Sequence, residues 1–586
     1  MTLTLRLPLP EETAARPLAM PDQDLSAPFT DPAAPGIRSA PGTRAIRGLT
    51  LTAPLGLATL LGWSSFAWFA LDGPPGPVEI ALVAVTAFAF YWLALSFCSA
   101  LLGLLWRPSA PAAPGDGLRL AILLPMYGEP AVDTIGAAVR LLAGLDGVGR
   151  HAVSLHVLSD TRDAKAAMQE DAALRALRLA HPHLAIHARR RVANTDYKSG
   201  NIRDWVVTRG HDHDAILILD ADSVMEPGTV RRMADLMSAE PGLGLIQAVP
   251  RVLPGETVWQ RLQAFASEVY GVNLARGFSM WAGDDANFLG HNALVRTRAF
   301  AACAGLPHLP GRPPRGGVIL SHDFVEAALI RRAGWGVRML PEAAASFEAT
   351  PATLPGYLRR DRRWCQGNMQ HLRLLATPGL HPVSRFHLLQ GAMAYLASLW
   401  WMTVLLLWAV SGQDGAMPRF FSDNPLMPDW PDHPMLSQAA LVGLVVLVLL
   451  GPKLAGVVAH LRDRRPAPGQ LPGFAVSVLA EIVLSIIIAP ALMVHQVRAV
   501  LRTLAGIDGG WTPHAAGRPA LRTLLRFHRT ETCLGLGLLG LASIGHLTIW
   551  LLPVAMSLLL TVPVSWLVQC DVGRTSLLKP LQEATP

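Results

Sequence analysis

Five long stretches of the chain lack Asp, Glu, Lys and Arg, and they limit its fold more than any other feature. They cover residues 48–71, 80–106, 388–410, 436–452 and 532–570. An α-helix needs about 20 apolar residues to cross the hydrocarbon of a bilayer. The first three stretches are long enough, and the fourth is long enough if Lys453 extends its charge to the interface. The fifth predicts two short spans that separate near Pro553.

The stretch 471–504 is also apolar, but it contains Glu481 and a central Pro490. Proline removes a backbone donor inside a helix, so we expect a membrane hairpin or a broken helix here. The sequence therefore predicts about eight membrane spans in all. With 51% hydrophobic and 16% charged residues, the composition excludes an ordinary soluble protein.

Arginines gather on one side of the predicted spans. Three precede the first span and three follow the fourth, whereas residues 72–79 carry only acidic charges. By the positive-inside rule, both termini, the large domain and the basic loop 505–531 are cytoplasmic. Residues 1–45, rich in Pro and Ala, are predicted to be a disordered tail, and residues 571–586 a second tail. The net charge of +7 suits the inner face of a membrane, and nucleic-acid binding is not needed to explain it.

Residues 115–350 alternate between short apolar runs and helical patterns. Such alternation predicts βαβ units and a mostly parallel sheet in a cytoplasmic α/β domain. In these sheets, ligands bind beyond the carboxyl ends of the strands. The predicted strands are 119–125, 151–160, 184–190 and 215–219, and the predicted helices are 132–145, 164–180 and 200–208.

Polar residues follow three of these strands at the same edge of the sheet. Tyr127 and Glu129 follow the first strand, Asp160 the second, and Asp220 and Asp222 the fourth. Three polar clusters at one edge are hard to assign to packing. We therefore expect a ligand site there.

The run DAILILDADSV ends in two aspartates that point the same way. Adjacent carboxylates raise each other's pKa unless a cation lies between them. Their oxygens suit Mg²⁺ or Mn²⁺, and Mg²⁺ is usually shared with a substrate phosphate. Alternatively, Asp220 and Asp222 belong to a helix cap and a solvated turn.

Three other candidates also have structural alternatives. Asp160 and Asp323 are each suited to capping the helix that follows, and Lys198 to lying exposed on a loop. The tract HDHD at 211–214 has a metal-like composition, but it precedes its strand and is interpreted as a solvated loop.

Residues 351–385 are predicted to form amphipathic helices at the membrane interface, and they contain YLRRDRRWCQGNMQH. Arginine forks onto phosphate oxygens, and an indole stacks on a sugar ring. The alternative is a basic belt with an interfacial tryptophan.

The motifs PMYGEP, SDTRD, YKSGN, DAD, GHN, SHD and RRDRRW follow one another in this order, with predicted spans on both sides. This set resembles the processive membrane glycosyltransferases of family 2, which include the cellulose and hyaluronan synthases. Within that family, LPMYGEP, ILDADSVM, FLGHNALVR and LSHDFVEA look most like the glucan biosynthesis glucosyltransferase H branch. The resemblance covers residues 46 onward and implies a GT-A-type domain embedded in a multi-pass helical bundle.

The resemblance implies a role for each motif at the nucleotide end of the site. Asp160 would bind the uridine base, with Glu129 in the loop that lines the pocket. Lys198 would contact the nucleotide or its diphosphate. Asp222 would be the direct ligand of Mg²⁺ or Mn²⁺, with Asp220 beside it.

The resemblance assigns the remaining roles to the acceptor end. Asp323 would be the general base, Arg363 would steady the diphosphate, and Trp364 would stack on the acceptor sugar. Arg360 occupies the glutamine position of the family's QxxRW motif, and SHD replaces TED, so the linkage cannot be copied from cellulose. Residues 510–513 occupy the place of a gating loop, with interfacial anchoring of Trp511 as the alternative.

The activity that the resemblance implies is inverting, processive transfer of glucose from UDP-glucose to a growing glucan chain. The product would be the β-1,2 backbone of osmoregulated periplasmic glucans, exported across the bacterial inner membrane. Acyl carrier protein and a periplasmic glucan-processing protein are further implied partners, beside the membrane lipid bilayer. The alternatives are another family 2 synthase, cellulose-like or using UDP-GlcNAc, and a transporter with a nucleotide-binding domain.

Overall fold

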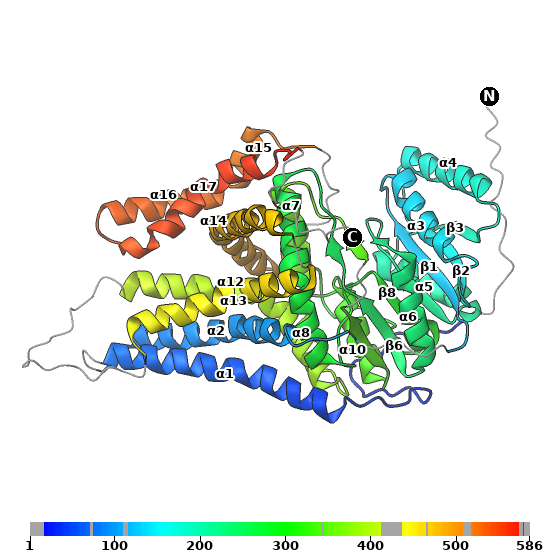
Figure 1. The fold of residues 1–586 in the computed structure, drawn as a ribbon, viewed down its shortest axis with the longest axis horizontal. Coiled ribbons are helices and arrows are strands. Elements are labelled where there is room, and N and C mark those ends of the chain that lie inside the picture. Colours follow the sequence, from blue (N-terminus) through cyan, green and yellow to red (C-terminus); the bar gives the residue numbers. More distant parts are fainter. Residues whose placement is uncertain are drawn as a thin grey trace, which may run out of the picture.

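Long helices lie side by side next to an α/β domain, with little mixing of the two parts (Figure 1). This arrangement comes from a computed structural model. It describes residues 17–70, 74–108, 115–341, 345–411, 436–464, 467–507, 517–573 and 578. Trp511 and its loop therefore lie outside the described residues.

Four parallel strands form one half of the main sheet. They are β1 (Arg119–Met126), β2 (Ala152–Ser159), β3 (Ile186–Arg190) and β4 (Ala215–Ile218). Their order is β3-β2-β1-β4, and each pairs with its neighbour in parallel. The predicted strands and their alternation with helices are confirmed.

Three further strands complete a seven-stranded sheet in the order β3-β2-β1-β4-β8-β6-β9. The strand β8 (Ala293–Arg296) runs antiparallel to both of its neighbours, β4 and β6 (Leu243–Ala248). The last strand, β9 (Gly336–Leu340), is parallel to β6. A small second sheet has the order β5-β10-β7, with β5 at Val224–Met225, β10 at Ser346–Glu348 and β7 at Arg251–Val252.

Both faces of the main sheet are buried. Successive side chains of a strand point to opposite faces, so β1 contributes to two separate cores. Leu120, Ile122 and Leu124 pack under α3 (Ala131–Leu145) and α6 (Pro227–Ala239). Ala121 and Leu123 pack on the other face with Trp205 of α5 (Tyr197–Arg209) and Phe300 of α9 (Thr297–Cys303). The remaining helices of the domain are α4 (Ala164–Ala180), α7 (Val258–Ala266), the π-helical turn η3 (Ser267–Gly271), α8 (Val272–Ala282) and α10 (His322–Arg332).

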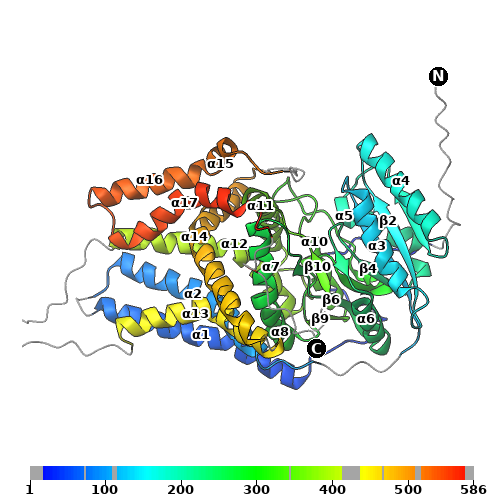
Figure 2. The ribbon, with the colours of Figure 1, turned by 45° about the horizontal axis from the view of Figure 1, so that its top comes forward.

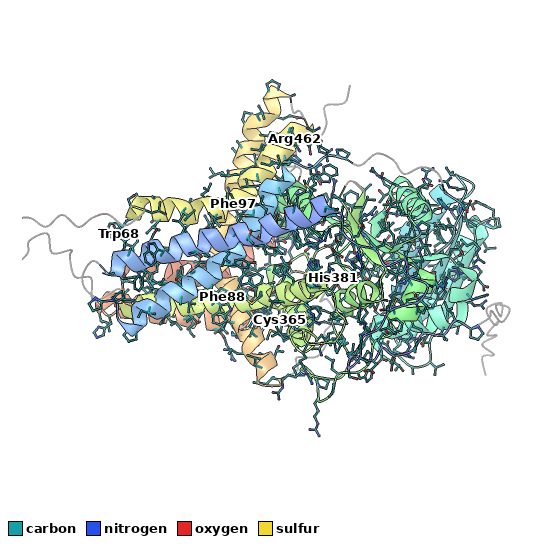
Figure 3. All side chains as sticks on the ribbon, turned by 90° about the horizontal axis from the view of Figure 1, so that it is seen from below. Trp68, Phe88, Phe97, Cys365, His381 and Arg462 are labelled. Carbon is teal, nitrogen blue, oxygen red and sulfur yellow. The ribbon has the colours of Figure 1, made fainter. Side chains whose placement is uncertain are left out.

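Among the residues that the structure describes, five helices are long and apolar enough to cross a membrane, fewer than the eight spans predicted. They are α1 (Pro41–Phe69), α2 (Pro77–Gly103), α12 (Pro382–Ser411), α13 (Gln438–Arg464) and α14 (Leu471–Leu504). Trp68 lies at the end of α1 that is farthest from the domain (Figure 3). Arg462 lies near the place where the long helices meet the α/β domain, which we call the junction. The fifth apolar stretch forms two shorter helices, α16 (Arg529–Ser543) and α17 (Leu552–Val568), after the small helix α15 (Leu521–Phe527).

The predicted hairpin or broken helix at 471–504 is wrong, because α14 is continuous over 34 residues. Pro490 lies inside it, and the carbonyl of Ile487 accepts a hydrogen bond from Ser557 of α17. A neighbouring helix thus satisfies backbone near the proline. Phe474 packs against α7, while Val500 packs against Cys365 of α11 (Leu354–His371), so both halves of α14 contact elements at the junction (Figure 2).

The predicted disordered tail is also wrong for residues 17–40, which we call the strap. The strap lies in an extended path against the domain, and α1 begins at Pro41, earlier than the predicted residue 46. Its backbone bonds to Ala333 through the amide of Asp31 at 3.0 Å, and the Asp31 carboxylate accepts from the indole of Trp335. Composition indicates disorder only when a segment lacks buried partners, and this one has them.

A buried ion cluster joins the strap, the domain and α1. Asp285 is fully buried and pairs with Arg47 of α1 at 2.6 Å. It also pairs with Arg331 of α10 and accepts from Ser39 of the strap. We call these four residues the Asp285 cluster.

Candidate active site

The polar residues at the carboxyl edge of the sheet do converge. Glu129 follows β1 and accepts a hydrogen bond from the amide of Tyr127. Burial raises the pKa of Glu129 above its ordinary value, although this hydrogen bond opposes the shift. Asp160 follows β2, and its amide donates to the carbonyl of Met126 at 2.8 Å. The two strand ends are therefore tied together.

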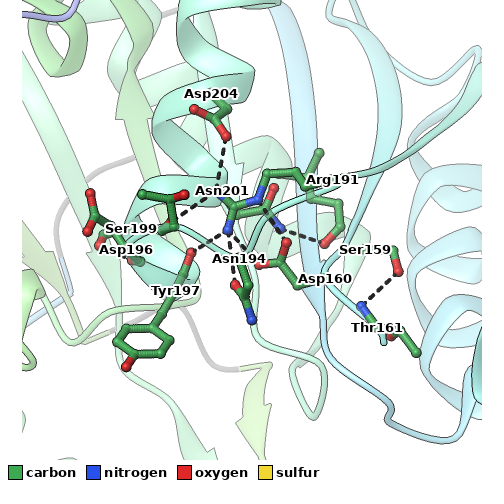
Figure 4. Close-up of polar contacts among 12 residues, drawn as sticks. Ser159, Asp160, Thr161, Arg191, Asn194, Asp196, Tyr197, Ser199, Asn201 and Asp204 are labelled. Atoms are coloured by element: carbon green, nitrogen blue, oxygen red, sulfur yellow. Dashed lines mark hydrogen bonds and ion pairs between the residues drawn. The ribbon is translucent and has the colours of Figure 1, made fainter. Parts of the chain in front are cut away.

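Asp160 is buried, and both of its oxygens are occupied by one arginine. Arg191 donates from Nε at 2.8 Å and from Nη2 at 2.7 Å, which is a forked ion pair (Figure 4). Arg191 was not among the predicted site residues. It is the last of three arginines in a row, and a run of like residues gives no signal for which of them points inward.

Lys198 lies at the start of α5 and reaches the end of β4. Its Nζ pairs with Asp220 and donates to the carbonyl of Gly290 at 2.7 Å. Gly290 has φ +93, and a Cβ built on it would lie 3.3 Å from Oδ2 of Asp323. Lys198 thus links Asp220 to the backbone of Gly290, beside which Asp323 lies. Three of the predicted site residues meet here.

The pKa values of the two aspartates of the DAD motif are shifted in opposite directions. Burial raises the pKa of Asp220, but the positive charges of Lys198 and His291 and the hydrogen bond from Lys198 together outweigh burial and hold this pKa below its ordinary value. The pKa of Asp222 is raised by desolvation and by the negative charge of Asp220. A divalent cation would reverse the shift at Asp222.

Any metal at the DAD motif would have few protein ligands. Within the described residues, no group of three or more His, Cys, Asp or Glu is arranged to hold a metal ion. Asp222 is exposed and makes no hydrogen bond or ion pair to another described residue. This arrangement fits a Mg²⁺ or Mn²⁺ that takes most of its oxygens from a bound diphosphate and from water.

A buried histidine stands behind the DAD motif. His291 pairs with Glu348 of β10 at 3.2 Å, and its other nitrogen lies 3.3 Å from Ser223 Oγ. Ser223 in turn accepts from the amide of Asp220 at 2.9 Å. Burial opposes protonation, but Asp220 and Glu348 raise the pKa of His291 to about 9. His291 lies in the GHN motif, but its partner Glu348 is distant in the sequence, so no local pattern indicated its role.

Asp323 is the second residue of α10, where the helix N-terminus favours a carboxylate. Burial raises the pKa of Asp323, while its neighbour His322 opposes the shift. His322 itself pairs with Glu326 at 3.1 Å. A half-buried carboxyl with a raised pKa can accept a proton at neutral pH.

Helix α11 carries the arginines and the tryptophan and lies between the domain and the membrane helices (Figure 2). Trp364 is exposed, and the guanidinium of Arg360 lies over its ring at 4.6 Å from the centroid. Arg363 is half-buried and makes no hydrogen bond or ion pair to another described residue. Burial lowers the pKa of Arg363, and the nearby Tyr197 opposes this.

Comparisons with known proteins identify the family. Residues 215–446 match the model of glycosyl transferase family group 2. The chain is 39% identical to glucans biosynthesis glucosyltransferase H of Shewanella oneidensis over 551 residues, which cover 89% of this chain and 76% of that protein. It is 38% identical to the protein of the same name from another Shewanella strain, over 97% of this chain and 82% of that protein. The chain belongs to the glucans biosynthesis glucosyltransferase H family.

Membership of the glucosyltransferase H family makes this chain a hexosyltransferase. Among solved structures, a mannosyltransferase from Pyrobaculum calidifontis bound to GDP-mannose and Mn²⁺ is similar over 66% of this chain and 99% of that one. The two are 16% identical, with a TM-score of 0.42. At that distance the assignment to the glucosyltransferase H family rests on the sequence relatives.

Proposed function

We propose that this enzyme is an inverting, processive synthase that transfers glucose from UDP-glucose to a growing glucan chain. The observation that supports the proposal is that Lys198 pairs with Asp220 and bonds the carbonyl of Gly290, beside which Asp323 lies. A cation for the diphosphate, carboxylates for a metal and a base for the acceptor are the groups that glycosyl transfer from a nucleotide sugar requires.

The donor would bind along the carboxyl edge of the sheet. Asp160 and the loop of Glu129 lie at the ends of β2 and β1, where they suit the uridine base. Lys198 and the half-buried Arg363 suit the diphosphate. Asp222, with Asp220, would hold Mg²⁺ or Mn²⁺, which supplies positive charge to the departing diphosphate.

The acceptor would enter from the side of α11. Trp364 offers an exposed ring for a sugar, and Arg360 fixes that ring by lying over it. Asp323 removes the proton of the acceptor hydroxyl while its oxygen attacks the anomeric carbon. UDP leaves from the opposite face, so one base without a carboxylate nucleophile inverts the configuration, and an α-linked donor gives a β-glucan.

We further propose where the enzyme lies in the cell and which glucan it makes. The chain would lie in the bacterial inner membrane with its domain in the cytoplasm, and the glucan would be the β-1,2 backbone of osmoregulated periplasmic glucans. Export would follow the helices next to Trp364, because α11, which carries Trp364, lies between the domain and those helices. Acyl carrier protein and a periplasmic glucan-processing protein stay predictions from the resemblance.

The test is replacement of the proposed base. Membranes or purified protein carrying Asp323→Asn receive radiolabelled UDP-glucose with Mg²⁺ or Mn²⁺. We expect glucosyl transfer to fall by about 10²–10⁴-fold, while binding of UDP-glucose stays within about twofold of the unaltered protein. Asp133→Asn, on the exposed side of α3, is the matched control and should leave transfer unchanged.

Three results would contradict the proposal. Undiminished transfer by Asp323→Asn would remove Asp323 as the base. Incorporation from UDP-GlcNAc instead of UDP-glucose, or a product with β-1,4 linkages, would favour another family 2 synthase. Glucan export by Asp222→Ala without any synthesis would favour a transporter.

A further inference from the structure

The side chain of Arg191 forms hydrogen bonds with several groups besides Asp160. It follows directly after β3 and is 8% exposed. Besides Asp160, its guanidinium donates to the carbonyls of Thr195 and Tyr197 at 3.0 Å each. It also donates to Asp204 at 3.0 Å and to Asn194 at 3.2 Å (Figure 4).

The two carbonyl bonds enclose a turn with unusual backbone geometry. Asp196 has φ 55 and Tyr197 has φ 52, a left-handed conformation that residues with a Cβ rarely adopt. Two consecutive residues of this kind persist only where the surroundings hold them. The bonds from Arg191 to the residues on either side of Asp196 hold this turn, and His308 adds a contact to the Asp196 side chain at 2.8 Å.

The turn delivers Lys198 to the site. Lys198 comes directly after Tyr197, in the first turn of α5, and its Nζ meets Asp220 and Gly290. A different backbone conformation at residues 196–197 would redirect the start of α5 and withdraw Nζ from both partners. The position of Lys198 therefore depends on the turn, and the turn depends on Arg191.

We infer that Arg191 is a positioning residue that joins the two ends of the donor site. One guanidinium orients Asp160, where the nucleoside binds, and fixes the turn that carries Lys198 to the diphosphate. This inference rests on the proposed function for the identity of the donor. It adds that nucleotide-sugar affinity depends on a residue that touches neither the nucleotide nor the sugar.

Arginine is needed at this position for a geometric reason. Its five N–H donors have fixed directions, and here Nε, Nη1 and Nη2 all bond in one plane to partners on three sides. A lysine keeps the charge but offers one flexible ammonium, which cannot fork onto Asp160 and reach two carbonyls together. The variant Arg191→Lys therefore removes the fixed geometry of the guanidinium while it keeps the positive charge.

The experiment compares Arg191→Lys with Arg190→Lys. Arg190 is the preceding residue, and it also makes two ion pairs, with Glu170 and Asp171, both at 2.9 Å. Those partners lie on α4, away from the turn. For Arg191→Lys we expect the KM for UDP-glucose and the Kd for UDP to rise about tenfold or more, with kcat within about threefold of the unaltered enzyme. Arg190→Lys should leave KM and Kd within about twofold.

An unchanged KM and Kd in Arg191→Lys would overturn the inference, and so would an equal rise in both variants. If Arg191→Lys does not fold, Asn194→Ala takes its place, because it removes one bond of the guanidinium from a partly exposed loop. It should raise the Kd for UDP about threefold, and an unchanged Kd would again overturn the inference. Because binding of UDP is measured directly, this result is independent of which sugar the enzyme transfers.

Discussion

Gly290 is the residue where the base, the lysine and the DAD motif come closest together. Its φ of +93 lies in the region that favours glycine, and its missing side chain leaves room for the Asp323 carboxylate. A methyl group here would strain the backbone and contact Oδ2 of Asp323 at 3.3 Å. The position thus sets how close the base lies to Lys198.

We predict that Gly290→Ala lowers kcat by about tenfold or more, because it displaces Asp323 and the carbonyl that holds Lys198. Steady-state kinetics with radiolabelled UDP-glucose would measure this. Gly228→Ala is the control: its φ is not positive, and no atom lies within 4 Å of a Cβ built there. That change should leave kcat unaltered and, if anything, stabilise the fold by about 0.4–1 kcal/mol. Equal kinetics for both variants would show that Gly290 tolerates a side chain.

At the residue scale, the sequence predicted only those site residues that follow directly after an apolar strand. Asp160, Asp220 and Glu129 follow apolar runs, so their common edge could be inferred from the alternation of strands and helices. Arg191 and His291 could not be assigned in this way. Their importance comes from partners far along the chain, such as Glu348 for His291, and local pattern does not contain that information.

Among the elements, β2 and β3 carry a stack of histidines away from the active site. The rings of His156 and His187 lie 4.7 Å apart, and His213 meets His156 edge-on at 5.2 Å. Burial lowers the pKa of His156 well below its usual range, and the positive charge of a protonated His187 or His213 lowers it further. Arg209 and Arg189 act in the same direction.

This stack predicts loss of stability in acid. Because the pKa of His156 is lower in the folded protein, the unfolded chain binds more protons once the pH falls below about 6.5. The melting temperature should therefore fall when the pH is lowered from 7.5 to 5.5. The variant His156→Phe keeps a ring in the stack, and its melting temperature should fall less over the same change. Thermal unfolding in detergent at both pH values would test this. His183→Gln, at an exposed position, is the control and should behave like the unaltered protein.

A second prediction concerns the contact between α13 and α14. Lys453 Nζ lies 2.7 Å from both oxygens of Glu481, which is 3% exposed, and 3.2 Å from Ser485. Removing one partner leaves a charge without its counterpart, so Glu481→Ala should lower the free energy of unfolding by about 3 kcal/mol. The double variant Lys453→Met with Glu481→Leu should lose much less. Equal losses in the two proteins, measured by chemical denaturation in detergent, would contradict this reading.

The elements that sequence patterns missed have a common cause. The strands β6, β8 and β9 follow the DAD motif in the chain, and β8 enters the sheet antiparallel between two strands that are distant in sequence. Likewise, Pro490 predicts a break in isolation, whereas a serine of α17 stabilises the helix around it. A local sequence pattern predicts a helix or strand correctly only when the elements packed against it do not change its conformation.

For the molecule as a whole, the Asp285 cluster connects the strap, the α/β domain and α1 through one buried carboxylate. Asp285 is fully buried, Arg331 is 7% exposed, and Arg47 comes from a candidate membrane helix. We predict that Asp285→Asn lowers the free energy of unfolding by about 3–5 kcal/mol, because it leaves two arginines without their carboxylate.

Asp284→Asn provides the control for that prediction. Asp284 is the adjacent residue and also pairs with an arginine, Arg338, at 2.6 Å, but its side chain is 21% exposed. Water can replace part of the lost interaction there, so the loss should be clearly smaller. Thermal unfolding of both variants in detergent would decide between them. A larger loss for Asp284→Asn would mean that the cluster does not hold the parts together.

The strap has a consequence for biosynthesis. Its residues leave the ribosome early, yet the groups that they dock against, such as the carbonyl of Ala333, are made about 300 positions later. Helix α1 has therefore emerged and is available to the insertion machinery long before the strap has anywhere to bind. Closure of the strap onto the finished domain is then among the last steps of maturation, and it joins a segment made before α1 to one of the last parts of the domain to fold.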